Sequence, residues 1–318
     1  MSFSSFLKWI LVLFVSVLAA PSFGAEPLHD GSLQASRISG PPTFMPLEWA
    51  QERTLEAQLR GSIRSVLPTG NRKVAALTFD LCETAGEVYG YDAAVVDYLK
   101  AARVKATFFA GGKYMKTHPA QSMALMSEPL FEIGNHSWSH KNFRKIPPDE
   151  MEDQVLRTQR QYELLRQELV TATPPGPKRG IDPTSIPAAP RLFRFPYGTC
   201  TPEALNLLAH LGLASIQWSI VSGDASPSQT SSGIIRTVLG SMKPGAIVVF
   251  HANGRGHGTS GALPVLVPKL RSAGYDFLTV SELLDAGTPL VVSECYEEKP
   301  GDNFRYDKKP RGNKGGNR

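Results

Sequence analysis

Residues 132–143 read E-I-G-N-H-S-W-S-H-K-N-F, a short apolar run followed by two histidines, His136 and His140. Their four-residue spacing would place both imidazoles on the same side of one helical turn, which suits a metal ion. A pair of polar residues on a solvated turn is the simpler alternative. Three further stretches favour the metal interpretation, because each is a strand-like apolar run that ends in residues able to do chemistry: L-T-F-D-L-C-E at 77–83, F-R-F-P-Y-G at 193–198 and V-V-F-H-A-N-G at 248–254.

Short apolar runs alternate with amphipathic stretches from residue 73 to residue 286. Strands that alternate with helices predict parallel β/α units, either in an open sheet or closed into a barrel. A segment of this length, roughly 210 residues, is ample for one hydrophobic core. The predicted strands are 74–79, 106–110, 131–134, 192–194, 214–218, 246–250 and 276–279, and the predicted helices are 93–102, 149–168, 202–210, 231–242 and 263–273.

Reactive side chains in parallel β/α folds gather at the carboxyl ends of the strands, where loops direct them into one crevice. The residues at or just past such predicted ends are Asp80, His136, Arg194, Asp224 and His251. They predict a shared pocket suited to metal-assisted hydrolysis, in which imidazoles hold a divalent ion, a carboxylate takes a proton from water and another histidine protonates the leaving group. The sequence has no G-x-S-x-G nucleophile elbow, so catalysis by a nucleophilic serine is unsupported.

The first 24 residues resemble a signal peptide. Lys8 precedes an apolar run at 9–20, and Ser22 and Gly24 have the spacing of a signal peptidase site. The alternative is an uncleaved anchor, but about twelve apolar residues fall short of the roughly twenty that a spanning helix needs. The sequence therefore predicts export to the periplasm or the extracellular space, without a stable membrane span.

Two other segments lack the β/α pattern: one precedes the predicted β/α domain at 73–286, and the other is an insertion within it. Residues 25–72 form a lead-in segment, in which apolar residues recur every third or fourth position over 47–67, and this predicts a helix that ends in a turn at 68–70. Residues 173–190 contain six prolines and predict a stiff surface loop, placed to form one wall of a cleft.

The positive charge of the chain is concentrated at its carboxyl end. The formal net charge is +5, and residues 299–318 alone carry seven basic and two acidic residues. The remainder is therefore close to neutral, and nothing indicates a nucleic-acid partner. Residues 287–318 are predicted to be an extension with a disordered basic tail, either solvated or resting on an anionic wall polymer or membrane surface.

Five motifs follow one another along the chain: T-F-D at 78–80, H-S-x-x-H at 136–140, R-F-P-Y-G at 194–198, W-x5-D at 218–224 and F-H at 250–251. In this order they resemble the NodB-homology polysaccharide deacetylases, carbohydrate esterase family 4, over residues 73–284. The resemblance implies a distorted (β/α)7 barrel. It also implies a hydrolase that removes acetyl groups from N-acetylated sugars of a polysaccharide.

The resemblance assigns catalytic roles residue by residue. Asp80 matches the catalytic base, and Arg194 matches the arginine that orients and tunes that carboxylate. His251 matches the general acid that protonates the departing amine. Asp224 matches the carboxylate that holds this histidine in its charged, correctly turned state.

Binding roles follow from the same resemblance. His136 and His140 match the metal-binding histidines, and zinc or a similar divalent ion is the implied cofactor. Tyr197 matches the residue whose backbone amide helps to bind the oxyanion, a role that fixed N–H donors suit. Trp218, which opens the W-x5-D motif, is expected beside the substrate.

The chain departs from the family at the metal site. The family usually reads T-F-D-D-G-P, and its second aspartate completes the site, but this position is Leu81. Either Asp80 turns to the metal, or Glu83 or a neighbouring loop supplies the third ligand, or the metal is bound poorly or not at all. Glu83 could equally be an ordinary surface residue. Ala225 and Val221 replace a usual tryptophan and an often acidic residue, which implies a differently walled acyl pocket.

Three cysteines in an exported protein allow at most one internal disulfide. Cys82 and Cys200 each follow a motif on the same predicted rim, so a bridge between them would pin two loops of the site together. Cys295 is the alternative partner. A third alternative is that Cys82 binds a soft metal ion through its thiol.

The expected partner is an acetylated polysaccharide. Peptidoglycan, an exopolysaccharide and chitin-like oligomers all stay open, as does cleavage of O-acetyl esters, and no oligomeric state is predicted. The alternative from another class is a carbohydrate-binding protein that keeps the cleft but lost turnover with the second aspartate. Catalysis is favoured because Asp80, Arg194, Asp224 and His251 are all present, and folding alone does not require that set.

Overall fold

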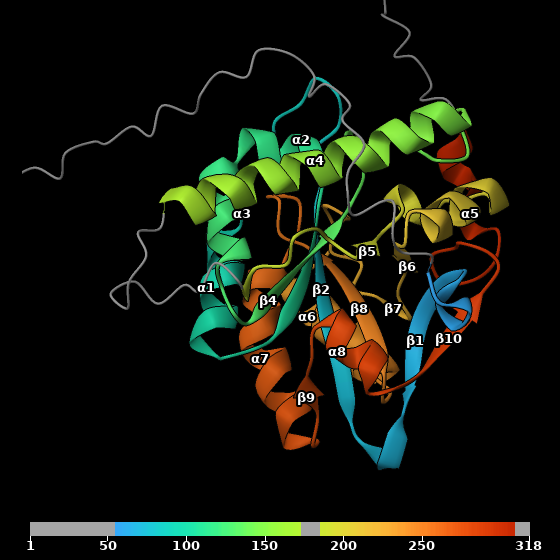
Figure 1. The fold of residues 1–318 in the computed structure, drawn as a ribbon. Helices are drawn as coiled ribbons and strands as arrows, with labels where there is room; N and C mark the ends of the chain where they lie inside the picture. Colours follow the sequence, from blue (N-terminus) through green and yellow to red (C-terminus); the bar gives the residue numbers. More distant parts are fainter. Residues whose placement is uncertain (1–54, 173–184, 309–318) are drawn as a thin grey trace, which may run out of the picture. The chain divides into compact units, whose positions relative to one another are not determined.

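The structure is a computed structural model that describes residues 55–172 and 185–308 (Figure 1). Four predicted features therefore lie wholly or partly outside the described residues. They are the signal peptide at 1–24, the first part of the lead-in segment, most of the insertion at 173–190 and the last ten residues.

Seven strands close into a ring in the order β1-β6-β5-β4-β3-β2-β8 and back to β1. Neighbouring strands pair in parallel, except that β1 meets β8 through a single antiparallel pair, Ser65 with Ala246. The ring confirms the predicted distorted (β/α)7 barrel. Its strands are β1 (Ser62–Pro68), β2 (Val74–Leu81), β3 (Ala106–Ala110), β4 (Phe131–Asn135), β5 (Leu192–Phe193), β6 (Ala214–Ile216) and β8 (Ala246–His251).

Three more strands extend the sheet around the ring. β7 (Ile220–Val221) pairs with β8, β9 (Asp276–Phe277) pairs with β2, and β10 (Gly287–Val292) lies antiparallel to β1. Every residue of β2 is buried, as expected for a central parallel strand that is covered on both faces.

Helices lie outside the ring and cover its strands (Figure 1). The long helix α4 packs against α2 and α3, and α7 packs against α1 and α6. Each of the seven predicted strands and five predicted helices has an observed counterpart. The α-helices of the described residues are α1 (Ala93–Ala101), α2 (Gly112–Thr117), α3 (Pro119–Met126), α4 (Pro148–Ala172), α5 (Pro202–His210), α6 (Ser231–Ser241), α7 (Thr259–Ser272) and α8 (Val280–Asp285).

The prediction of a helix over 47–67 is wrong for the residues that the structure describes. Ser62–Pro68 is strand β1, and only the 3-10 helix η2 (Ala57–Leu59) is helical before it. Ile63 and Val66, which gave the pattern its helical period, are buried in the same hydrophobic cluster, because a register irregularity between Ile63 and Ser65 brings both to one face of β1. Pairing with β6, β8 and β10 outweighs the local pattern. The barrel domain consequently begins near residue 62 rather than 73, while the predicted turn at 68–70 coincides with the 3-10 helix η3 (Thr69–Asn71).

The prediction of a disordered tail is also wrong as far as residue 308. β10 and the 3-10 helix η6 (Asp302–Asp307) are ordered parts of the same domain, which therefore extends past residue 286. Composition alone misses this because a disulfide and ion pairs, rather than apolar burial, hold the segment. Among the described residues, no helix has the length and apolar character needed to cross a bilayer.

Candidate active site

The predicted site residues meet at the carboxyl ends of neighbouring strands. Asp80 is the penultimate residue of β2 and His251 the last of β8, and their Cα atoms are direct partners in the parallel ladder. Partners in one register project to the same side of a sheet, so both side chains face the same end of the barrel, and we call the surroundings of these residues the pocket. His136 follows β4 directly, and Arg194 follows β5.

Asp80 and Arg194 form a buried ion pair. Arg194 is fully buried, and its Nη1 donates to Asp80 Oδ1 at 2.8 Å. Its other nitrogens donate to the carbonyl oxygens of Ile216 (3.2 Å) and Gln217 (3.1 Å), and its guanidinium lies 4.0 Å from the centre of the Phe109 ring. Burial acts to raise the pKa of Asp80, but the adjacent guanidinium outweighs it and holds that pKa below the ordinary value. Asp80 is therefore ionised at neutral pH.

Asp224 and His251 form a second pair across the pocket. Asp224 Oδ1 accepts from His251 Nδ1 at 2.8 Å, and Oδ2 accepts from the His251 backbone N–H (2.8 Å) and from Thr259 Oγ1 (2.7 Å). Burial acts to lower the pKa of His251, but the Asp224 carboxylate and its hydrogen bond outweigh it, so the pKa lies above its ordinary value. The side chain of His251 remains 22% exposed. His251 is thus an accessible imidazole whose protonated form is favoured.

The paired histidines lie on a loop, so the predicted helical turn is wrong. His136 begins the loop after β4, and Ser137 and His140 both adopt positive φ angles, 63° and 55°. Asn135 Oδ1 accepts from the Ser137 N–H at 2.9 Å and fixes the turn. The two imidazoles still face each other, with ring centres 5.0 Å apart.

The hydrogen bonding of His136 leaves one nitrogen free for a metal ion. Its Nδ1 lies 2.8 Å from the carbonyl oxygen of Arg194, which can only accept, so Nδ1 carries the proton and Nε2 a lone pair. Nε2 is buried without a hydrogen-bond partner among the described residues, and it lies 3.6 Å from Asp80 Oδ2. Burial also lowers the pKa of His136, and the pKa of His140 lies well below its ordinary value through burial and the nearby His136 ring. Both rings are therefore neutral, as ligation requires.

A third ligand atom lies beside the histidines. One atom from each of Cys82, His136 and His140 lies within 4.8 Å of the other two, among the residues that the structure describes. Nitrogen and sulfur ligands in groups of three suit zinc, which in catalytic sites keeps three protein ligands and one open position. Burial and the nearby Asp80 carboxylate raise the pKa of the Cys82 thiol to about 12.

Glu83 points away from this cluster. It is only 1% exposed, which corrects the interpretation of it as a surface residue. Its Oε1 accepts from the Tyr89 N–H (3.0 Å) and from Thr117 Oγ1 (2.9 Å), and Lys113 Nζ lies 3.6 Å from Oε2. Glu83 therefore ties the loop after β2 to α2 and does not take the third ligand position.

The P-Y-G turn forms another part of the pocket. Tyr197 and Gly198, within the 3-10 helix η5 (Pro196–Gly198), both have positive φ angles, 58° and 59°. The ring of Tyr197 lies edge-on to His140, with centres 4.5 Å apart. The amide of Tyr197 is among the first N–H groups of η5, which have no acceptor within their own helix and can serve a ligand.

Trp218 packs beneath this turn. It is 6% exposed, its Nε1 donates to the Glu297 carbonyl at 3.1 Å, and its ring lies 5.4 Å from the Arg194 guanidinium. A Cβ added at Gly198 would lie 3.1 Å from the indole, so glycine permits this close approach. Trp218 therefore packs against Arg194 and Gly198. A contact of Trp218 with the substrate stays a prediction.

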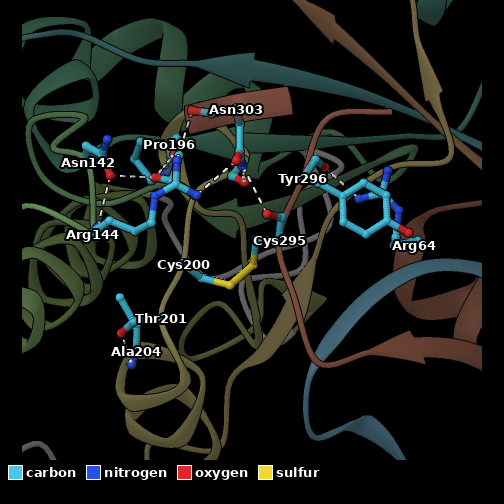
Figure 2. Close-up of a disulfide and its surroundings, with 12 residues drawn as sticks. Arg64, Asn142, Arg144, Pro196, Cys200, Thr201, Ala204, Cys295, Tyr296 and Asn303 are labelled. Atoms are coloured by element: carbon cyan, nitrogen blue, oxygen red, sulfur yellow. Dashed lines mark hydrogen bonds between the residues drawn. A yellow bond between two sulfur atoms is a disulfide. The ribbon is translucent and has the colours of Figure 1, made fainter. Parts of the chain in front are cut away.

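The disulfide joins Cys200 to Cys295, so the predicted Cys82–Cys200 bridge is wrong and the alternative partner is correct (Figure 2). Cys82 is free and buried. The physical reason lies in the path of β10, which brings the carboxyl-terminal residues back to the P-Y-G turn. The bridge pins residues 293–308, which we call the C-terminal strap, to the loop after η5.

The C-terminal strap contacts the pocket through side chains that the motifs do not include. Asn303 Nδ2 donates to the carbonyl oxygens of Gly198 and Cys295, and Arg144 donates to Asn303 Oδ1 at 2.9 Å (Figure 2). The ring of Tyr306 lies 5.0 Å from that of Tyr197. The sequence motifs did not predict these contacts of the C-terminal strap. Cys295, as a possible disulfide partner, was the one feature of the sequence that indicated them.

Comparison with known proteins identifies the family. Residues 68–180 match the family model for polysaccharide deacetylases. A chitooligosaccharide deacetylase of Bradyrhizobium sp. is 31% identical over 203 residues, which cover 59% of this chain and 82% of the relative. The chain belongs to the polysaccharide deacetylase family. This membership confirms the family and the enzyme class that the five motifs predicted.

Other relatives are named for different activities. A peptidoglycan-N-acetylglucosamine deacetylase of Bacillus cereus is 28% identical over 215 residues, 67% of this chain and 69% of the relative. A solved structure from Bacillus anthracis, described as a pseudoenzyme of carbohydrate esterase family 4, is 25% identical with a TM-score of 0.57, covering 71% of this chain and 70% of that one. The polysaccharide deacetylase fold is thus compatible with different glycans and with loss of turnover.

Proposed function

We propose that the protein is an exported, metal-dependent hydrolase that removes acetyl groups from N-acetylated sugars of a polysaccharide. The observation that carries the proposal is the pairing of opposite charge states on adjacent strands. Arg194 holds Asp80 of β2 ionised, and Asp224 raises the pKa of His251 of β8 and so favours its charged form. A carboxylate and an imidazolium facing one pocket are the base and the acid that amide hydrolysis needs.

Asp80 is placed to act as the base. Arg194 occupies Oδ1, and Oδ2 is directed toward His136 at 3.6 Å. This oxygen accepts the proton of the attacking water. Two hydrogen bonds to the Ile216 and Gln217 carbonyls fix the Arg194 guanidinium, and its third bond fixes the Asp80 carboxylate, so little reorganisation is needed when that carboxylate is protonated.

His251 is placed to act as the acid. Its Nδ1 is bound to Asp224, so the proton on Nε2 is the one available to the leaving group. Donation to the amine nitrogen completes cleavage of the C–N bond. The Asp224 carboxylate is fixed by three hydrogen bonds, from His251 Nδ1, the His251 backbone N–H and Thr259 Oγ1, and it stabilises the charged imidazole.

The remaining groups bind and orient the acetyl group. His136 and His140, with Cys82 beside them, would hold a divalent ion. When bound there, the ion would act as a Lewis acid on the acetyl carbonyl and the attacking water. The amide of Tyr197 is a fixed donor for the oxygen that becomes negative in the transition state.

Two further points of the proposal concern location and substrate. Residues 1–24 have the pattern of a signal peptide, which supports a protein of the periplasm or the extracellular space. The activities for which the relatives are named support peptidoglycan or chitooligosaccharides as the class of substrate. The protein acts on the acetylated polymer as its partner.

The test is acetate release by the mature protein, loaded with zinc or cobalt, from chitooligosaccharides and from peptidoglycan fragments. His251→Ala should lower kcat by about 10²–10⁴, because it removes the general acid. His210→Ala is the matched control, since His210 is an exposed histidine at the end of α5. Release from O-acetylated xylan but not from N-acetylated glycans would reassign the protein as an esterase.

A second candidate function is glycan binding without turnover. Leu81, which stands in place of the family's second aspartate, and the similarity to a family pseudoenzyme favour it. Saturable binding of acetylated oligosaccharides by the metal-loaded wild-type protein, with no acetate release from any of the glycans above, would replace the deacetylase proposal with this one.

A further inference from the structure

The register of β2 decides which side chains face the pocket. Side chains alternate along a strand, and Phe79 and Leu81 belong to the hydrophobic cluster between the ring and its helices. Asp80 faces the pocket instead, and Cys82, one residue past the end of β2, has its ligand atom within 4.8 Å of those of His136 and His140. Leu81 is fully buried in the cluster, and the family's aspartate position is therefore turned away from the histidines. Cys82 takes its place in space.

Cys82 is a protonated thiol in the metal-free site, and a bound ion would deprotonate it on coordination. Its hydrogen-bond partner suits a metal ligand. Asn253, which is fully buried, donates from Nδ2 to the Cys82 carbonyl (2.9 Å) and to Cys82 Sγ (3.3 Å). A donor aimed at sulfur both orients it and stabilises negative charge on it, as outer partners of metal ligands do. The other two cysteines are bonded to each other, so no disulfide competes for this thiol.

We propose that Cys82, His136 and His140 form a zinc site in which a thiolate replaces the aspartate of the family pattern. Their ligand atoms lie within 4.8 Å of one another, and the unpartnered Nε2 of the buried His136 is directed into the cluster. A thiolate carries the same single negative charge as a carboxylate, so the net charge of the loaded site is unchanged. Asp80 is thereby left free, with Oδ1 bound by Arg194, to act as the base.

The exchange of oxygen for sulfur has a consequence for metal selectivity. Thiolate and imidazole ligands suit zinc and cobalt, whereas magnesium, calcium and manganese suit oxygen ligands. The site should therefore discriminate against the hard cations. This inference rests on the proposed function for the role of the metal, but binding can be measured without any substrate.

The experiment is titration of the metal-free mature protein, its disulfide intact, with Co²⁺ and with Zn²⁺. Cobalt bound to a thiolate has a near-ultraviolet charge-transfer absorption that cobalt bound only to nitrogen and oxygen lacks. Wild-type protein should bind one ion per chain and show this absorption. Cys82→Ser should lose the absorption and weaken zinc binding by more than the about 10–100-fold that loss of an outer partner costs.

Cys82→Asp is the matched variant, because it returns a carboxylate to this place. It should bind cobalt without the thiolate absorption and should bind manganese more tightly than wild-type protein does. Circular dichroism confirms that each variant is folded. Wild-type protein that binds no ion, that binds cobalt without the thiolate absorption, or whose zinc affinity is unchanged in Cys82→Ser overturns the inference. These outcomes hold whether or not acetate release is found, so failure of the metal site and failure of the deacetylase proposal are distinguishable.

Discussion

Removing the disulfide should destabilise the whole barrel, because the bridge closes a long loop. Cys200 and Cys295 are 95 residues apart, and the enclosed segment includes β6, β8 and β10. In the chain-entropy treatment, closing a loop of this length in the unfolded chain contributes about 4.7 kcal/mol to the free energy of unfolding. We expect the double variant Cys200→Ser/Cys295→Ser to lose most of this amount.

The assay is urea unfolding of the metal-free mature protein, followed by circular dichroism. A loss of this size corresponds to a fall in melting temperature on the order of 10–20 °C for a domain of this length. Wild-type protein treated with a thiol reductant provides the same comparison without substitution. Thiol titration of unreduced protein in denaturant should find one reactive cysteine, Cys82.

The same variant should also weaken substrate turnover, because the C-terminal strap loses its covalent attachment beside Gly198. A free energy of unfolding within about 1 kcal/mol of the wild-type value would refute the loop-closure reasoning. Three reactive thiols in the unreduced, denatured protein would refute the pairing itself.

Three further substitutions test the pocket and the ring. Arg194→Met leaves the Asp80 carboxylate buried and unpaired, so the free energy of unfolding should fall by about 3–5 kcal/mol. The pKa of Asp80 should rise, and the acidic limb of the pH profile of kcat/KM should move to higher pH. A limb that stays in place contradicts the assignment of Asp80 as the base. Asp224→Asn removes the charge that raises the pKa of His251, so the alkaline limb of that profile should move to lower pH, and a shift to higher pH would contradict it. Gly245→Ala places a Cβ 1.7 Å from a carbonyl oxygen of β1, at a φ of +77°. Thermal denaturation should therefore show a fall in the free energy of unfolding larger than the about 1–2 kcal/mol that backbone strain alone would cost. The control Gly240→Ala in α6, where nothing lies within 4 Å of the added Cβ, should not destabilise the protein.

Local patterns carried most of the fold prediction. The buried strands β2, β3 and β8 are short, predominantly apolar runs, and such runs can be recognised without tertiary information. β1 was not readable, since its apolar spacing also fits a helix and only its three partner strands select the extended form. The order of the C-terminal strap could not be predicted for a related reason, because its contacts join residues more than 90 positions apart.

The residues of the site could be predicted from the sequence, but not all of the contacts between them could. The sequence by itself determined that Asp80, His136, Arg194 and His251 would converge, because strand ends in a parallel barrel share one face. Only the tertiary structure decided that Cys82, rather than Glu83 or Cys200, lies beside the histidines. The physical reason is register: a shift of one residue along a strand turns a side chain to the opposite face, and registers are set by pairing between distant segments of the chain.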